Sequence, residues 1–217
     1  MILDRTRQME SGKDIIPEPA LRRLPWYLAY VGILRERGVE YVSSTQISRD
    51  LRVDASQIAK DLSFLDIKGK TRIGYEVSLL EHKLEEFLGF KRQHRAVIVG
   101  AGSLGGALMQ DSGLTRYGLE IVAGFDVDQS LVGTLKHGLP VYPVEELVGR
   151  CRELGAGIGI ITVPVEHAQS VADRLVEAGV KAIWNFTPIR ICAPGDVVIS
   201  NTSIYAHLAV MYNRMNG

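Results

Sequence analysis

The chain contains little of several residue classes, and each scarcity excludes a kind of protein. Among 217 residues there are only two cysteines, Cys151 and Cys192, too few for a disulfide framework and without the histidine spacing of a zinc site. No apolar run approaches the roughly 20 residues of a membrane span, and the first residues lack the apolar core of a signal peptide. We therefore expect a cytoplasmic protein with no metal site and no membrane segment.

An excess of either charge is also missing. The chain has 25 basic and 25 acidic residues, which excludes a protein that is basic over its entire surface. The distribution is uneven, because residues 20–72 contain ten basic and six acidic side chains, a net of +4, and the remainder is net −4. Near residues 90–94 the sequence changes from helical segments rich in Arg, Lys and Ser to apolar, β-rich runs interrupted by Gly and Pro. Two domains are expected, and 46% apolar content is enough for two cores.

The first half has the spacing of three helices. Apolar residues recur at helical intervals over 25–37 and predict a first helix that ends at Gly38. Short helices are expected at 45–51 and 55–65, because N-cap acceptors precede each of them. The LRVD segment between these two helices is only long enough for a tight turn. This pattern is typical of a helix-turn-helix, whose second helix lies in the DNA major groove, although a plain three-helix bundle is an alternative.

The segment that follows favours DNA binding. KGKTRIGYEV, residues 68–77, has a glycine turn and alternating apolar residues, which predicts a β-hairpin, and a hairpin directly after a helix-turn-helix is a wing. Long cations at its tip suit a minor groove or phosphates. An amphipathic helix over 81–94 is expected to lead into the second half. The expected DNA contacts are Ser43, Ser44, Ser56, Gln57, Lys60, Lys70 and Arg72, although Ser43 and Ser44 suit simple helix capping equally well.

The second half contains a nucleotide-binding motif. RAVIVGAGSLGGAL places Gly100, Gly102 and Gly105 at G-x-G-x-x-G spacing between a buried strand, 96–99, and a helix. The first glycine permits a tight turn, the second lets a pyrophosphate approach the backbone, and the third lets the helix pack on the strand. A second apolar strand ends at Asp126, 21 residues beyond Gly105, where a carboxylate binds the adenosine ribose and repels a 2′-phosphate. The sequence therefore predicts binding of NADH or NAD⁺.

Further apolar strands are expected at 140–142, 157–163, 182–186 and 197–200, separated by helical stretches. This βαβ alternation predicts an α/β fold with a mostly parallel, doubly wound sheet of the Rossmann type. Ligands of such sheets bind at the carboxyl ends of the strands, which places residues 162–164 in the site, although Pro164 equally suits the start of a helix. The expected cofactor contacts are Gly100, Ala101, Gly102, Ser103, Leu104, Gly105, Asp126, Val127, Thr162, Val163 and Pro164.

No catalytic group accompanies this motif. Neither His167 nor His207 has a neighbouring Asp or Lys constellation, and no substrate domain is evident. We therefore assign no catalytic residue and expect the cofactor to act as a signal. The alternatives are a small NAD-dependent oxidoreductase, and a nucleotide- or CoA-binding regulatory module whose winged helix contacts proteins.

Together these motifs resemble the Rex family of redox-sensing transcriptional repressors over residues 19–212. The resemblance implies a homodimer whose winged-helix domains bind a palindromic DNA operator and whose Rossmann domains bind NADH or NAD⁺, NADH lowering the operator affinity. It also implies a C-terminal helix that is exchanged between subunits, although packing on its own domain is the simpler alternative. The segments that carry the resemblance are RRLPWYL (22–28), VSSTQIS (42–48), AKDLSF (59–64), IGY (73–75), GAGSLG (100–105), FDVD (125–128), TVP (162–164) and NFTP (185–188).

The expected organisation is a disordered tail at 1–18, a winged-helix domain at 19–92, a Rossmann domain at 93–202 and a dimerisation helix at 203–217. The chain departs from the family pattern where the two domains communicate: Ala29 replaces an arginine, Asp111 an aromatic residue and Ser203 an aspartate. In the recognition helix Ala59 replaces an arginine, and in the wing residues 71–72 are Thr-Arg in place of Arg-Gly. Loss of the arginine together with the aspartate removes a salt bridge as a pair. We therefore expect that cofactor binding persists, that its coupling to DNA is weaker or uses other contacts, and that the operator sequence or affinity differs from the common pattern.

Overall fold

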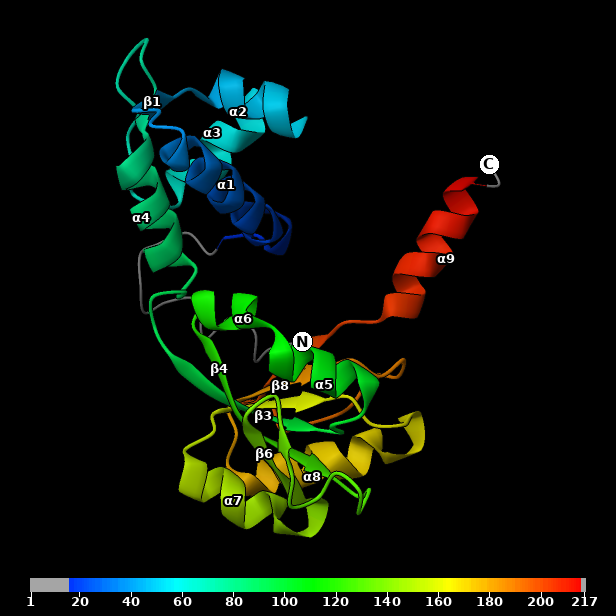
Figure 1. Cartoon of the computed structure of the whole chain (residues 1–217). Coiled ribbons are helices and arrows are strands. Elements are labelled where there is room, and N and C mark those ends of the chain that lie inside the picture. Colours follow the sequence, from blue (N-terminus) through cyan, green and yellow to red (C-terminus); the bar gives the residue numbers. More distant parts are fainter. Residues whose placement is uncertain (1–15, 216–217) are drawn as a thin grey trace. The chain divides into compact units, whose positions relative to one another are not determined.

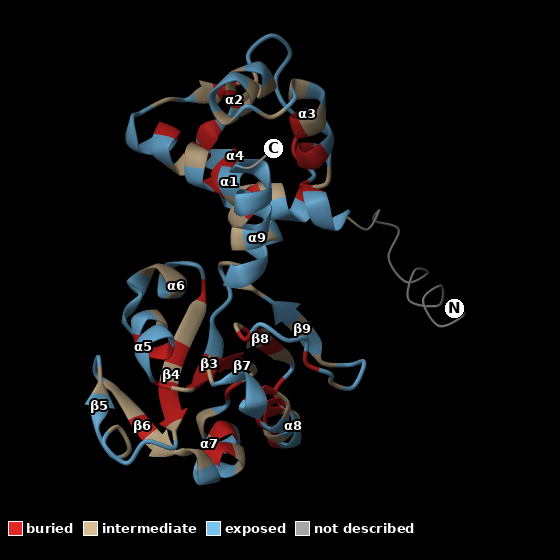
Figure 2. Ribbon diagram, turned by 90° about the vertical axis from the view of Figure 1, so that its right-hand side faces the viewer, coloured by how far each residue is buried: buried red, intermediate tan, exposed pale blue. Residues whose placement is uncertain are grey.

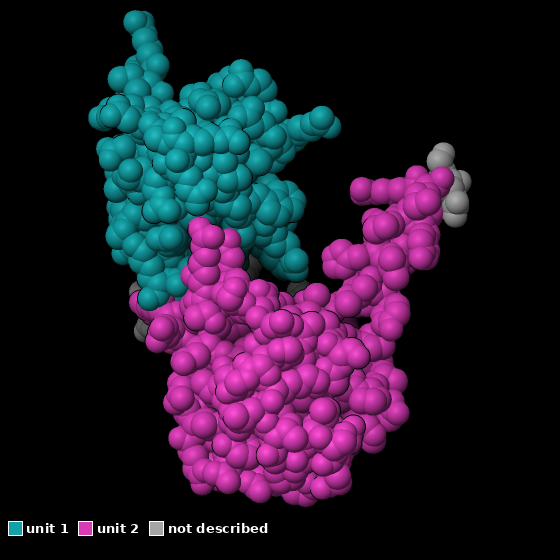
Figure 3. Space-filling model, in the orientation of Figure 1, with its two compact units in different colours: residues 1–91 teal, residues 92–217 magenta. Residues whose placement is uncertain are grey.

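The chain forms two compact units, residues 1–91 and 92–217, which are coloured separately in Figure 3. The computed structural model describes residues 16–215. The expected disordered tail at 1–18 lies outside this range except for its last three residues, and Glu18 already begins a helix. Each unit has its own buried core, which is red in Figure 2.

Within the residues that the structure describes, unit 1 contains four helices and a small antiparallel sheet. Its core is built from one face of every helix and includes Leu24, Tyr27, Ile58, Leu62 and Leu84, all with no exposed surface. Helices α2 and α3 are joined by residues 52–54 and form the expected helix-turn-helix. The elements are α1 (Glu18–Glu36), β1 (Tyr41–Val42), α2 (Ser44–Leu51), α3 (Ala55–Ser63), β2 (Tyr75–Glu76) and α4 (Val77–Phe87).

Helix α1 begins seven residues earlier than its sequence pattern predicts. Pro17 occupies the N-cap position, and Pro25, expected near the helix start, lies inside the helix. An interior proline lacks a backbone N–H and removes one helical hydrogen bond. In α1 this cost is offset because Leu24, Tyr27 and Leu28 on either side of the proline are buried in the core.

The predicted hairpin over 68–77 is wrong in its pairing. Strand β2 pairs antiparallel with β1, which precedes the helix-turn-helix, while Lys70 and Gly74 form only an isolated bridge around the turn. At Gly74, φ is +110° and an added β-carbon would lie 2.3 Å from the Val42 carbonyl oxygen, so the segment is held tightly against β1. The Val77 N–H bonds to the Glu40 carbonyl, and Val77 begins α4 instead of ending a strand. The connecting helix is therefore 77–87, not 81–94.

Unit 2 confirms the predicted α/β class. Its seven-stranded sheet has the order β5-β6-β4-β3-β7-β8-β9, in which all neighbours are parallel except β5 and β6. Apart from β5, this is the order of dinucleotide-binding folds, with the change of direction between β3 and β7. The strands are β3 (His94–Val99), β4 (Leu119–Asp126), β5 (Leu135–Lys136), β6 (Leu139–Pro143), β7 (Ile158–Ile161), β8 (Ala182–Asn185) and β9 (Val198–Asn201).

Helices cover both faces of this sheet (Figure 1). Val97 and Val99 of β3 pack with α7 and α8, whereas Ala96 and Ile98 pack on the face of α5 and α6. Successive residues of a strand point to opposite faces, so a strand buried on both sides is continuously apolar, as the sequence pattern indicated. The helices are α5 (Ser103–Gln110), α6 (Ser112–Arg116), α7 (Leu147–Leu154) and α8 (Ala168–Ala178).

The last helix, α9 (Ile204–Met215), is amphipathic but buries none of its residues. Its first turn is capped by Ser203, whose side-chain oxygen accepts a hydrogen bond from the Ala206 N–H at 3.2 Å. The apolar residues Tyr205, Met211 and Tyr212 are more than half exposed. None of the helices between residues 16 and 215 has the length and apolar content needed to cross a membrane.

Candidate functional site

The glycine motif forms the tight loop between β3 and α5. At Gly105 a β-carbon would lie 1.9 Å from the Gly100 carbonyl oxygen, and at Gly100, where φ is +96°, it would lie 2.7 Å from the carbonyl oxygen of Thr162. The Thr162 hydroxyl donates to the Gly100 carbonyl at 2.7 Å and so fastens the end of β7 to the loop. A β-carbon at Gly102 meets no atom of the chain within 4 Å. Two glycines therefore serve packing, and the third leaves space at the N-terminus of α5.

Asp126 ends β4 beside this loop. One carboxylate oxygen accepts the Ala101 N–H at 2.6 Å, and the other accepts the N–H groups of Val127 at 2.8 Å and Asp128 at 3.0 Å. These bonds fix the carboxylate at the carboxyl edge of the sheet. Because each carboxylate oxygen has further acceptor capacity, the group can still receive hydrogen bonds from ribose hydroxyls.

Two cavities lie at this edge, each of about 390 Å³, and they share residues 162–164. The first extends along Asp126 and α8, and the second is on the side of β8 and the start of α9. Ala101, Ser103 and Gly105 line neither cavity, whereas Leu104 lines the second. The first is lined by Val99, Gly100, Gly102, Phe125, Asp126, Val127, Val144, Thr162, Val163, Pro164, His167, Ser170, Val171 and Arg174, and the second by Leu104, Thr162, Val163, Pro164, Val165, Phe186, Thr187, Pro188, Ile204 and Tyr205.

Several of these lining residues were missed from the sequence. His167, Ser170, Val171 and Arg174 follow one another at intervals of three and one, so they share one face at the start of α8, and that helical spacing was a usable signal. Lys136 was also missed, and its Nζ donates to the Ala101 carbonyl at 2.6 Å. No local pattern identifies it, because β5 meets the loop only through the fold.

The residues present suit a dinucleotide. Helix α5 begins at Ser103 with no side chain capping its first turn, so backbone N–H groups face the open side of Gly102, and such a helix N-terminus favours a diphosphate. The Asp126 carboxylate lies at the same edge for a ribose. By contrast, no group of three or more His, Cys, Asp or Glu that could hold a metal ion occurs within residues 16–215. Burial raises the pKa of Cys151 to about 11, which keeps this thiol protonated.

The helix-turn-helix in unit 1 is held by its N-caps. The Ser43 hydroxyl oxygen accepts the Gln46 N–H at 3.1 Å, which makes capping the observed role of this serine. The Asp54 carboxylate accepts the N–H of Ser56 at 2.8 Å and of Gln57 at 3.2 Å, and it also accepts the Ser56 hydroxyl at 2.5 Å. These hydrogen bonds fix the first turn of α3.

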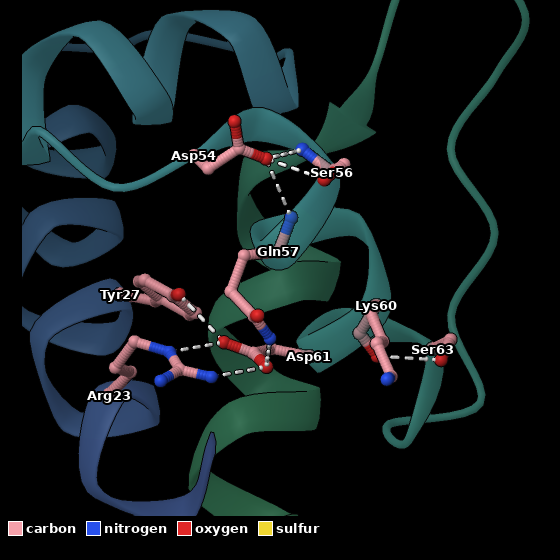
Figure 4. A network of polar contacts seen from close by, with 8 residues as sticks. All are labelled: Arg23, Tyr27, Asp54, Ser56, Gln57, Lys60, Asp61 and Ser63. Carbon is pink, nitrogen blue, oxygen red and sulfur yellow. Dashed lines mark hydrogen bonds and ion pairs between the residues drawn. The ribbon is translucent and has the colours of Figure 1, made fainter. Parts of the chain in front are cut away.

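A buried ionic network joins α3 to α1 (Figure 4). The Asp61 carboxylate, which has no exposed surface, accepts two hydrogen bonds from Arg23, at 2.7 and 2.8 Å, and one from the Tyr27 hydroxyl at 2.8 Å. It also accepts the Gln57 side-chain N–H at 2.8 Å. The side-chain nitrogen of Gln57, one of the expected DNA contacts, is therefore bound to Asp61 within unit 1. Contact of this residue with DNA stays a prediction.

The network also sets the charges of its members. Burial by itself raises the pKa of Asp61, but the donors from Arg23, Tyr27 and Gln57 outweigh it and hold that pKa below its ordinary value. The hydrogen bond to Asp61 raises the pKa of Arg23, and burial raises the pKa of Tyr27. Asp61 is therefore ionised and Tyr27 neutral at pH 7.

Ion pairing within unit 1 determines which cations remain available. In residues 20–72, Arg22 pairs with Glu18, Arg23 with Asp61, Arg35 with Glu81 and Arg49 with Asp50. Within residues 16–215, the remaining basic side chains of this segment form no ion pair with a carboxylate. They belong to the end of α1, the turn, α3 and the wing, and they are Arg37, Arg52, Lys60, Lys68, Lys70 and Arg72.

The cations expected to contact DNA are exposed. Lys60 points away from the Asp61 network in Figure 4, Ser44 is the first residue of α2, and Ser56 is the second residue of α3. At the wing, the Lys70 Nζ donates to the Tyr41 hydroxyl at 2.6 Å and lies 4.7 Å from the centre of its ring. Arg72 occupies the turn with a φ of +66°. Lys60, Lys70 and Arg72 are thus exposed cations of the same compact unit.

The three glycines of the loop are expected to respond differently to alanine. Gly105→Ala places a β-carbon against a backbone carbonyl, so it should lower the thermal unfolding temperature and abolish dinucleotide binding. Gly102→Ala meets nothing in the chain and should leave the unfolding temperature unchanged while it reduces dinucleotide affinity. Calorimetric unfolding and titration distinguish the two, and equal destabilisation by both would contradict this assignment.

Asp61→Asn should destabilise unit 1 by about 3 kcal/mol at pH 7, the lower end of the range for breaking a buried pair, because Arg23 is 21% exposed. Since the pKa of Asp61 is depressed on folding, its contribution is complete above a pH of about 4 and is lost as the pH falls through the folded-state value. Urea unfolding at pH 7 and pH 3 measures this. Arg22→Ala, in an exposed pair, is the control and should cost under about 1 kcal/mol. A difference between Asp61 and Asn that persists undiminished at pH 3 would exclude the ionic explanation.

The comparisons with known proteins agree with this geometry. Residues 91–189 match the family model described as "CoA binding domain", and residues 15–63 match the one described as "Putative DNA-binding protein N-terminus". A redox-sensing transcriptional repressor Rex of Bacteroides thetaiotaomicron is 58% identical over 98% of this chain and 96% of its own length. The Rex of Treponema denticola is 42% identical over 93% of this chain and 98% of its own length.

Two solved structures resemble the whole chain. The crystal structure of RSP in complex with NAD⁺ and operator DNA has a TM-score of 0.90 at 35% identity and covers 94% of each chain. RSP in complex with NADH has a TM-score of 0.84 at 34% identity and covers 94% of this chain and 96% of its own. With relatives of this identity over nearly its full length, the chain belongs to the Rex family of redox-sensing transcriptional repressors.

Proposed function

We propose that this chain is a transcriptional repressor that binds operator DNA through unit 1 and NADH or NAD⁺ through unit 2, and that NADH lowers its affinity for DNA. The observation that carries the proposal is the combination, in one chain, of a capped helix-turn-helix with unpaired cations and a glycine loop beside Asp126. The relatives are named as repressors, and RSP was solved with operator DNA, NAD⁺ and NADH. A cytoplasmic location follows from this function.

The cofactor would lie across the carboxyl edge of the sheet. Its diphosphate would meet the N–H groups around Gly102 and Ser103, and its adenosine ribose would meet Asp126, with residues 162–164 between the two cavities. When bound, the nicotinamide supplies a redox state that the protein reads. The chain's own contribution is to hold the dinucleotide and to favour a different conformation for each redox state.

The chain would act on DNA as a homodimer, because a palindromic operator requires two copies of unit 1. The exposed apolar residues of α9 support a second copy as its partner, with the helix exchanged between subunits. At the positions altered from the family pattern, Ala29 is exposed, Asp111 caps α6 through the Gly113 N–H at 2.8 Å, and Ser203 caps α9. Ala29 and Ser203 carry no charge and so cannot form the salt bridge of the family pattern, which supports a weaker coupling between cofactor and DNA.

Lys60→Ala should lower the affinity for a palindromic duplex about tenfold and reduce the slope of log K against log salt by about 1 for each phosphate that Lys60 contacts. Lys83→Ala is the matched control, because Lys83 lies on α4, outside the helix-turn-helix and wing, and pairs with Glu86. Fluorescence anisotropy over a range of salt concentrations gives both quantities. If Lys60→Ala binds the duplex as the control does, the assignment of α3 as recognition helix fails.

Asp126→Ala should reduce NAD⁺ and NADH affinity by about ten- to a hundredfold, since it removes a charged acceptor, while the cofactor-free protein still binds the duplex. Glu120→Ala, at the opposite end of β4, is the control and should change neither affinity. Calorimetry with NAD⁺, NADH and CoA measures binding, and CoA tests the other ligand class to which the family model refers. Tighter binding of CoA than of NAD⁺ would favour the alternative of a CoA-binding regulatory module. Separately, if NADH changes the operator affinity of the unaltered chain by a hundredfold or more, the weakened coupling is refuted.

A further inference from the structure

Lys136 lies against the glycine loop from outside the nucleotide motif. It belongs to β5, the two-residue strand that pairs antiparallel with β6 at the edge of the sheet. Its Nζ lies 2.6 Å from the Ala101 carbonyl oxygen and 3.3 Å from that of Gly102. The ammonium group therefore contacts the two residues that directly precede Ser103, the first residue of α5.

Gly106 provides the space for this side chain. A β-carbon at position 106 would lie 2.4 Å from the Cε and 2.9 Å from the Nζ of Lys136. The G-x-G-x-x-G motif requires glycine at positions 100, 102 and 105 only. The additional glycine in GSLGG is thus explained by the lysine, and the two residues form a fitted pair that brings a cation to the loop.

The charge of Lys136 has no acidic partner in the part of the chain that the structure describes. An ammonium group has three N–H donors, and the two carbonyl contacts account for two of them. The positive charge adds to that of the N-terminus of α5, where backbone N–H groups alone would otherwise face an anion. A half-buried cation at this place increases the attraction for a diphosphate more than an exposed lysine would.

We propose that Lys136 binds the diphosphate of the dinucleotide, as a cation that the glycine motif does not include. This inference rests on the proposed function, since it takes the loop to be a dinucleotide site. Direct binding of the diphosphate differs from a purely structural role of Lys136 in supporting the loop, because loss of structural support would lower the affinity for every adenosine ligand equally. It also differs from recognition of a 2′-phosphate, which would affect only the phosphorylated cofactor.

The test is a ligand series measured by calorimetry on the full chain. Lys136→Met keeps the length of the side chain and removes its charge, and it should weaken NAD⁺ and ADP about tenfold, weaken AMP less and leave adenosine unchanged. The loss should shrink as salt concentration rises. Lys136→Arg, which keeps the charge, should retain most of the affinity. Lys181→Met, which removes an exposed lysine at the opposite end of β8, is the control and should change nothing.

Gly106→Ala gives an independent measurement, because its β-carbon displaces a flexible lysine chain and not the backbone. The Gly106→Ala variant should fold normally and bind ADP more weakly, while its affinity for adenosine stays unchanged. An equal loss for adenosine and ADP, an effect confined to NADP⁺, or unchanged binding of NAD⁺ and ADP by Lys136→Met would each overturn the proposal. If the unaltered chain binds neither NAD⁺ nor ADP, the proposed function itself fails. If the unaltered chain binds both, and the Lys136 variants bind them with the same affinity as Lys181→Met, the proposed function stands without a role for Lys136.

Discussion

The Gly100 carbonyl oxygen occupies the space where any residue other than glycine at position 105 would have its β-carbon. This contact presses the first turn of α5 onto the end of β3, and the Thr162 hydroxyl ties the end of β7 to the same carbonyl. The point where the sheet changes direction is therefore closed by backbone and small side chains. The loop is held at the carboxyl edge of the sheet, and this places the N–H groups at the start of α5 beside the Asp126 carboxylate. Both cavities lie at the same edge.

In unit 1 a buried charge has a comparable role. Asp61 lies on the helix that the fold presents as a recognition helix, and it gathers donors from α1 and from its own preceding turn. Burying a carboxylate is costly unless donors surround it, so the network makes the orientation of α3 on α1 specific. Because Asp61 pairs with Arg23, the charge of this arginine is neutralised within unit 1. The basic excess of residues 20–72 is therefore left on the turn, α3 and the wing. A chain of zero net charge thus has a local cationic surface.

The arrangement also separates binding from communication between the units. The loop that would hold a dinucleotide and the helix that would read DNA are each complete within one unit. Among the positions where this chain departs from the family pattern, Ala29 lies on α1, Asp111 before α6 and Ser203 before α9, and the last two serve as helix caps. Because Ala29 and Ser203 carry no charge in place of an arginine and an aspartate, we propose that they act on the coupling free energy between the two ligands.

The sequence by itself determined the features that are local in the chain: the glycine spacing, Asp126 at the end of its strand, the two capped helices and the continuously apolar strands. It did not determine the β1–β2 pairing of the wing, the ion pair between Arg23 and Asp61, or the approach of Lys136 to the loop. These contacts join residues up to 38 positions apart, and the local sequence around them has no distinguishing period. Local spacing encodes an element and its buried face, whereas a contact between elements depends on how the completed cores pack, and only the tertiary structure decides that.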